Sequence, residues 1–294
     1  MKDNDSKGND RKAEKRSINI LLTNDDGIYA TGINELAKAL AAVADIYICA
    51  PEEEKSATSH SITVRKPFAV REVDHPAAVW AASVAGTPAD CVKVAVKVLR
   101  SRGVELDMVF SGINHGANLG TDTLYSGTVQ AAVEGALCDK PSVAVSVNSL
   151  SPKNWEPACR LAVNCAKKAY GRLDKNTVLN INLPDVPEED LKGVRYTRLG
   201  IREYDDWVKP YEGNEKVREK KQDGEEDEYI VMPQKNHIGG RMYIYGGQPV
   251  FFEELEDDVD IKAMQDGYAS ITPIKYDMTD HELIDEVKDW KIEE

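Results

Sequence analysis

The sequence predicts an α/β protein: a doubly wound, mostly parallel sheet with helices on both faces, extended by a C-terminal hairpin and tail. Two observations carry this prediction. Short apolar runs rich in Ile, Leu and Val have the continuous character of strands that are buried on both faces. They alternate with segments whose apolar residues recur at helical spacing, and this alternation favours parallel pairing because each helix carries the chain back across the sheet.

The first elements are a strand, a helix and two further strands. INILLT (18–23) is a continuous apolar run of strand length. DIYICAP (45–51) and WAASVAG (80–86) have the same character. Between the first two strands, apolar residues at helical spacing predict an amphipathic helix: Ile33, Leu36, Ala37, Leu40, Ala41 and Ala44.

The second helix has a clear start signal. Thr87 is placed as N-cap, Pro88 at the first helical position and Asp90 in the capping-box slot. The remaining core elements follow from the same two patterns. They are the strands DMVFSG (107–112), SVAVSV (142–147) and VLNINLP (178–184), a helix through Val129, Ala132, Val133 and Ala136, and a helix through Leu161, Ala162, Cys165 and Ala169.

The organisation predicted along the chain has three parts. Residues 1–17 are polar and mixed in charge, and we expect a disordered lead. Residues 18–199 form the α/β core. Residues 200–294 form an extension that we expect to serve oligomerisation, with a charged loop or hairpin at 211–229, a late strand YASITPI (268–274) and a short terminal helix.

Charge and composition exclude several classes of protein. The net charge is −14 and the sequence pI about 4.9, which disfavours binding to a nucleic acid polymer or an anionic membrane. No apolar stretch is long enough to span a membrane, and the N-terminal residues lack the apolar core of a signal peptide. Five cysteines without a C-x-x-C pair are typical of reduced thiols, so we expect a cytoplasmic protein.

Three polar loops are predicted to leave the same edge of the sheet. Asp25 and Asp26 follow the first strand, APEEEKSATSHS (50–61) follows the second, and SGINHGANLGTDTLYSGT (111–128) follows DMVF. In open α/β sheets, ligands bind outside the carboxyl ends of the strands, where the strand order reverses. Each loop taken alone is also typical of a turn or a helix cap, and their coincidence at one edge favours a functional site.

The composition of these loops predicts a metal ion beside an anion. A hard divalent cation would relieve the repulsion between Asp25 and Asp26, and oxygen ligands favour Mg²⁺ or Mn²⁺ over zinc. The five histidines lack zinc-site spacing, and His60 and His115 are left outside the metal shell. The segment Ser126-Gly127-Thr128 opens a helix whose N–H groups suit a phosphate.

Two other classes share the first clue. A receiver-like, Mg²⁺-binding signalling module also places paired acids after its first strand. It needs an acceptor aspartate at the tip of its central strand, where this chain has Ser111 and Gly112. A dinucleotide-binding domain should show G-x-G-x-x-G after the first strand, and NDDGIYATG instead places two carboxylates where a pyrophosphate would lie.

The chain resembles the SurE family of stationary-phase survival proteins, which are metal-dependent 5'/3'-nucleotidases. ILLTNDDGIYATGI is similar to its opening motif, APEEEKSATSHSIT to its second, GTPADCV to its third and SGINHGANLGTDTLYSGTVQAAVEGAL to its long signature. GYASITPI matches a late strand. The chain departs from the pattern at Thr31, where proline is usual, in residues 1–17, in the charged loop at 211–228, and in the acidic stretch at 253–260.

The resemblance implies a Rossmann-like fold and hydrolysis of nucleoside 5'- and 3'-monophosphates, with side activity on short polyphosphate. It implies a homodimer or homotetramer that exchanges its C-terminal hairpin and tail. The implied metal ligands, for one Mg²⁺ or Mn²⁺ per subunit, are Asp25, Asp26, Ser56 and Asn114.

The predicted chemistry is metal-assisted hydrolysis of a phosphomonoester. Asp25 and Asp26 fix the ion, and one of them also accepts the proton of the attacking water. The residues expected to hold the phosphate are Asn118, Ser126, Gly127 and Thr128. A covalent phosphoryl group on Asp25 is the alternative mechanism. The sequence leaves open the base, the preference for 5' or 3' substrates, the choice of Mg²⁺ or Mn²⁺, and dimer or tetramer.

Overall fold

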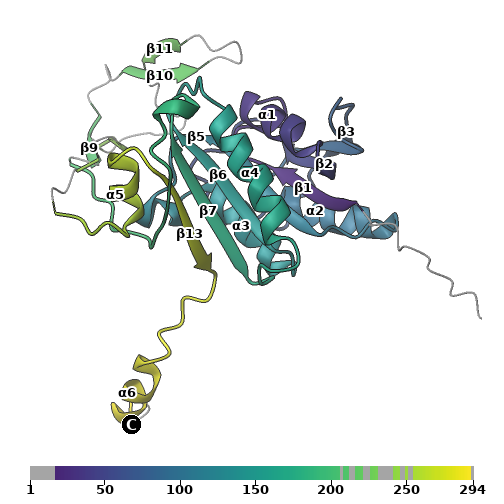
Figure 1. Cartoon of the computed structure of the whole chain (residues 1–294). Coiled ribbons are helices and arrows are strands. Elements are labelled where there is room, and N and C mark those ends of the chain that lie inside the picture. The colour runs from purple at the N-terminus through teal and green to yellow at the C-terminus, as the bar shows by residue number, and fades with distance from the viewer. Residues whose placement is uncertain are drawn as a thin grey trace, which may run out of the picture.

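The computed structural model describes residues 17–205, 208–211, 216–220, 226–230, 241–245, 249–250 and 254–292 (Figure 1). In chain order the elements are β1 (Ile18–Thr23), α1 (Thr31–Leu40), β2 (Ala44–Pro51), β3 (Val70–Glu72), β4 (Trp80–Val84), α2 (Pro88–Ser101), β5 (Met108–His115), η1 (Gly120–Leu124), α3 (Gly127–Leu137), β6 (Ser142–Asn148), α4 (Glu156–Ala169), β7 (Thr177–Pro184), η2 (Glu188–Asp190), β8 (Val194–Tyr196), β9 (Val208–Pro210), β10 (Lys216–Lys220), β11 (Glu226–Ile230), β12 (Tyr243–Tyr245), α5 (Asp260–Gln265), β13 (Ala269–Lys275) and α6 (Leu283–Asp289).

One sheet organises the core, with strand order β3-β4-β2-β1-β5-β6-β7-β13-β8. The six strands from β4 to β7 are parallel. At the edges, β3 runs antiparallel to β4 and β13 runs antiparallel to β7. The predicted fold class, a mostly parallel α/β sheet with helices, is therefore confirmed.

Helices cover the sheet on both faces. α1 and α4 pack together over one face, and their apolar residues join the largest core cluster. α2 and α3 pack together over the other face. The capping box predicted at the start of α2 is present, with Thr87 accepting from the Asp90 N–H and Asp90 accepting from the Thr87 N–H.

Two boundaries differ from the sequence prediction. α1 ends at Leu40, and Ala44 begins β2 instead of continuing the helical face. β5 runs on to His115, three residues beyond the predicted strand, so that Asn114 belongs to the sheet. In both places the boundary depends on hydrogen bonds to a neighbouring strand. The spacing of apolar residues along the chain gives no information about those bonds.

The strand order reverses beside β1. β2 lies on one side of β1 and β5 on the other, so the chain winds outward through β2 and then returns across β1. The carboxyl ends of β1 and β5 therefore meet at a topological switch point, the usual place for a ligand in such sheets. Asp25 and Asp26 follow β1 at this point.

The residues after 199 are partly inside the core sheet. β13 lies between β7 and β8, β10 and β11 form an antiparallel hairpin, and α6 stands apart from the sheet at the end of the chain (Figure 1). The division of the chain at residue 199 stays a prediction. The expected N-terminal lead and much of the charged loop lie outside the described residues. No helix in the described part of the chain has the length and apolarity needed to cross a membrane.

Candidate metal and phosphate site

The Asp25 carboxylate lies against the first turn of α3. The Thr128 N–H donates to Asp25 Oδ2 at 3.1 Å, and the Thr128 hydroxyl donates to Oδ1. A Cβ atom on Gly127 would lie 2.7 Å from Asp25 Oδ2, so only glycine allows this approach. The positive end of the α3 dipole therefore faces a protein carboxylate.

Burial sets the electrostatics of this carboxylate. Asp25 is almost fully buried, and this burial raises its pKa above the ordinary value of 3.8. The hydrogen bonds from Thr128 act in the opposite direction, and the negative charge of Glu54 raises the pKa further. A cation beside Asp25 would favour its ionised form.

Asp26 points toward the end of β5. Its Oδ1 atom lies 3.6 Å from Nδ1 of His115, and the Asp26 side chain is 11% exposed. The His115 ring in turn packs on Trp155, with 5.4 Å between the ring centroids. Asp25 and Asp26 thus turn to different neighbours, and Asp26 is the more accessible of the two.

Asn114 reaches the same edge through an irregularity in β5. The pairing of β5 with β6 shifts register between Ser111 and Asn114. Gly112 lies in this shift at φ +131°, and a Cβ there would be 2.2 Å from the Val145 carbonyl oxygen. The Asn114 amide nitrogen donates to the Gly116 carbonyl at 2.9 Å, so its oxygen is the atom suited to bind a cation.

Ser56 belongs to the loop of residues 52–63, called here the Ser56 loop. The Lys55 N–H donates to the Asp25 carbonyl at 2.7 Å, which joins this loop to the end of β1. The Ser56 hydroxyl, which is exposed, donates to the Glu54 carboxylate. Glu54 thus contacts Ser56, and its charge acts on Asp25. These interactions were not predicted, because the run PEEEK offers three equivalent glutamates.

Asn118 is held by a buried polar network. Its N–H donates to Asn182 Oδ1 at 2.7 Å, and its side-chain amide donates to Ser146 Oγ at 2.8 Å. The amides of Asn180 and Asn182 donate to its carbonyl at 2.8 and 3.1 Å. The sequence contains a signal for this network, since Asn180 and Asn182 are spaced to share one face of an otherwise apolar strand.

In the structure, the predicted phosphate donors therefore contact other groups of the protein. Ser126 caps α3, since its hydroxyl accepts from the Val129 N–H at 3.0 Å. Gly127 and Thr128 contact Asp25, and Asn118 contacts β6 and β7. Helix capping and carboxylate binding thus account for contacts that the sequence assigned to a phosphate, and the assignment itself stays a prediction.

The donor set fits a hard divalent cation. Asp25, Asp26, Ser56 and Asn114 offer carboxylate, hydroxyl and amide oxygens, which Mg²⁺ and Mn²⁺ prefer. Nearby oxygens that lack a hydrogen-bond partner among the described residues are Thr23 Oγ1, Asn24 Oδ1 and Ser111 Oγ. In the part of the chain that the structure describes, no three His, Cys, Asp or Glu side chains cluster as a metal site.

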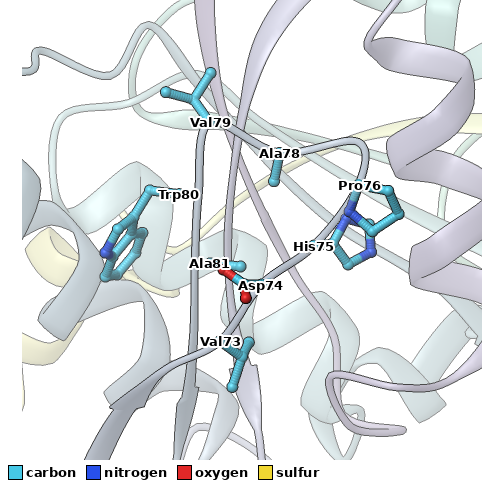
Figure 2. A pocket seen from close by; sticks show the side chains of 8 residues that line it. All are labelled: Val73, Asp74, His75, Pro76, Ala78, Val79, Trp80 and Ala81. Carbon is cyan, nitrogen blue, oxygen red and sulfur yellow. The ribbon is translucent and has the colours of Figure 1, made fainter.

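A surface hollow elsewhere has no such chemistry. It measures about 360 Å³ and lies at the turn between β3 and β4, lined by residues from Val73 to Ala81 (Figure 2). Figure 2 shows His75 and Pro76 on one side and Trp80 on the other. Trp80 begins β4, so this hollow lies at the amino end of the parallel strands, away from Asp25.

Comparisons with known proteins agree on one family. The family described as "Survival protein SurE" matches residues 20–206. The 5'-nucleotidase SurE of Desulforudis audaxviator is 42% identical over 284 residues, which cover 94% of this chain and 98% of that protein. The 5'-nucleotidase SurE of Syntrophomonas wolfei is 40% identical over 273 residues, covering 92% and 94%. The crystal structure of the SurE protein from Aquifex aeolicus aligns with a TM-score of 0.70 and 31% identity, covering 92% of this chain and 99% of that one.

Proposed function

The chain belongs to the SurE family and is a nucleotidase enzyme, and on this premise we propose that it is a divalent-cation-dependent phosphomonoesterase. Its reaction would release phosphate from nucleoside 5'-monophosphates, the activity for which the relatives are named. The proposal extends to nucleoside 3'-monophosphates and, as a side activity, to short polyphosphate. The match over most of the chain leaves the receiver-like alternative without support.

One observation carries the proposal. Two adjacent carboxylates, Asp25 and Asp26, stand at the switch point of the sheet beside the N-terminus of α3. The residues proposed to hold one Mg²⁺ or Mn²⁺ are Asp25, Asp26, Ser56 and Asn114. A bound divalent cation supplies positive charge that offsets the charge of the phosphoryl oxygens.

The side chains have distinct proposed roles. Asp25, buried and held by Thr128, binds the cation and orients it. Asp26 is more exposed, and we assign it to accept the proton of the attacking water. Both Asp25 oxygens already accept hydrogen bonds from Thr128, which disfavours the alternative in which Asp25 forms a covalent phosphoryl intermediate.

The phosphate is proposed to bind at the start of α3, beside η1, through Asn118, Ser126, Gly127 and Thr128. Ser126 uses its lone pair to cap the helix, so its hydroxyl proton can go to a phosphate oxygen. The Thr128 hydroxyl already donates its hydrogen bond to Asp25. Its contribution to substrate binding is therefore made through the position of that carboxylate.

We also propose a homodimer or homotetramer formed through the C-terminal residues. The tail carries large apolar side chains that are exposed in the single chain: Met278, Leu283, Ile284, Trp290 and Ile292. Exposed apolar surface of this kind favours burial against another copy. Size-exclusion chromatography with light scattering, on the full chain and on a chain ending at residue 276, tests this proposal.

The experiment for the activity is a phosphate-release screen. Substrates are nucleoside 5'- and 3'-monophosphates and a short polyphosphate, each with Mg²⁺, with Mn²⁺ and with chelator. The expected result is cation-dependent release from the monophosphates. Release from none of them with either cation would refute the proposed function.

A further inference from the structure

A buried carboxylate outside the site connects the Ser56 loop to two helices. Glu134 lies in the C-terminal half of α3 with its side chain 3% exposed. Its Oε2 atom is 2.9 Å from Nε2 of His60, in the Ser56 loop, and its Oε1 atom is 2.6 Å from Nζ of Lys93, in α2. The proposed mechanism uses none of these three residues.

We propose that Glu134 is a positioning residue. Through His60 it fixes the Ser56 loop against α3, and so it sets the position of the Ser56 hydroxyl relative to the Asp25 carboxylate. This inference rests on the proposed function, because it concerns the cation site assigned there. It makes α3 the common support of two ligands. Thr128 in its first turn holds Asp25, and Glu134, six residues further along, holds the loop that carries Ser56.

The loop needs such a support because its backbone is strained on both sides of Thr58. Ala57 has φ +53° and Ser59 has φ +51°, a backbone region that residues other than glycine rarely adopt. A residue keeps such backbone angles only when the surrounding contacts enforce them. The Ser59 N–H and hydroxyl donate to the carbonyls of Tyr125 and Leu124, at 3.1 and 2.6 Å, and His60 follows with its bond to Glu134.

The chemistry of Glu134 favours a geometric role over simple packing. A carboxylate buried this deeply is costly, and an apolar side chain would serve packing between α2 and α3 equally well. Burial opposes the ionisation of Glu134, yet the hydrogen bonds from His60 and Lys93 keep its pKa below the usual value. An ionised carboxylate accepts a directed bond from the imidazole, and a directed bond is what a loop of fixed shape requires.

The test separates positioning from stability with matched variants. His60→Ala removes the bond from the loop. His60→Gln replaces it with an amide N–H that can reach the position of Nε2. Lys93→Met removes the ion pair of Glu134 with α2, leaves the weaker hydrogen bond from the Cys138 thiol to Glu134 and does not touch the loop, and is the control. The cation alone is the probe: free Mn²⁺ is followed by electron paramagnetic resonance without nucleotide, beside melting temperatures.

We expect His60→Ala to bind Mn²⁺ about tenfold more weakly than wild type, as for other outer residues that support a metal ligand. His60→Gln should recover most of this loss. Lys93→Met should lower the melting temperature and leave Mn²⁺ binding unchanged. In activity assays His60→Ala should need more cation for half-maximal rate, while most of kcat returns at saturating cation.

Two results would overturn the inference. One is Mn²⁺ binding by His60→Ala that equals wild type; the other is a loss in Lys93→Met as large as that in His60→Ala, which would mean a purely structural network. If His60→Ala does not fold, Glu134→Gln takes its place, and unchanged Mn²⁺ binding in that variant counts equally against positioning. Wild-type protein that neither binds Mn²⁺ nor releases phosphate would instead refute the proposed function.

Discussion

The Asp25 carboxylate accepts two hydrogen bonds from one residue, Thr128, through its main-chain N–H and its hydroxyl. A helix N-terminus that could bind a free anion is thus joined to a carboxylate of the protein. This arrangement places a buried negative charge at the proposed cation site. It gives Thr128 a role that can be measured separately from substrate binding.

Thr128→Val should weaken the cation site. The change removes the hydroxyl donor and preserves the shape, so Asp25 loses one of its two bonds, a loss of about 1–3 kcal/mol for a charged acceptor. We expect the cation concentration for half-maximal activity to rise several-fold. The measurement is activity against Mg²⁺ or Mn²⁺ concentration. Thr123→Val is the control, because the Thr123 hydroxyl donates to the Gly120 carbonyl and not to Asp25. An increase confined to KM for the nucleotide would instead assign Thr128 to the phosphate.

Gly127→Ala should abolish most activity. The new Cβ would lie 2.7 Å from Asp25 Oδ2 and 2.8 Å from Asp25 Cβ, so the carboxylate must move. Alanine favours a helix interior over glycine by about 1 kcal/mol, but Gly127 is the first residue of α3, so this preference offsets little of the strain. Gly135→Ala, in the same helix, is the comparison: its Cβ meets Ser142 and Val109 in the core. That variant should have a lower melting temperature than wild type and the same cation requirement.

Asp26→Asn should melt at a higher temperature than wild type when both are free of metal. Neighbouring carboxylates repel each other, and for a pair with solvent access this repulsion costs about 1–2 kcal/mol. The variant relieves that repulsion, but it should gain less stability from Mg²⁺ or Mn²⁺ and lose most activity. Thermal melting with chelator and with saturating cation tests both statements. Lower stability without metal, combined with full activity, would show that the pair does not exist to hold a cation.

Removal of divalent cations should abolish phosphate release. The reason is the donor set, in which two carboxylates are joined only by neutral oxygens. Protein stripped with chelator is assayed before and after addition of Mg²⁺, Mn²⁺ or Zn²⁺. We expect recovery with Mg²⁺ or Mn²⁺. Full activity of stripped protein, or recovery with Zn²⁺ alone, would contradict the ligand assignment.

Acid should remove the stabilising effect of Asp90. Its burial opposes ionisation, but hydrogen bonds from Thr63 and Thr87 outweigh that effect and lower its pKa. A carboxyl with a lowered folded-state pKa contributes stability above its ordinary pKa of about 3.9 and loses it as pH falls through the folded-state value. Wild type should therefore exceed Asp90→Asn in free energy of unfolding at pH 6, and the difference should shrink toward pH 3. A difference that is constant over this range would show that Asp90 does not titrate with a lowered pKa.

The sequence by itself determined the fold class and the order of the core elements. Continuous apolar strands and amphipathic helices are local patterns, and the capping box of α2 is contained in four consecutive residues. The rule that parallel strands end at one edge also led to Asp25, Asp26 and the long loop before α3. These inferences need only spacing along the chain and the handedness of its connections.

The tertiary structure decided which side chains meet. Nothing local distinguishes Glu54 from its two neighbours, joins Glu134 to His60 across 74 positions, or directs Thr128 to Asp25 across 103. Such contacts depend on how deeply a helix packs on the sheet, and here Gly127 and the register shift at Gly112 allow the close approach. The position of Asn114 also depended on such contacts, since the sequence analysis placed this residue after the strand and the structure places it within β5. The sheet extends to it because its pairing with β6 resumes beyond the shift.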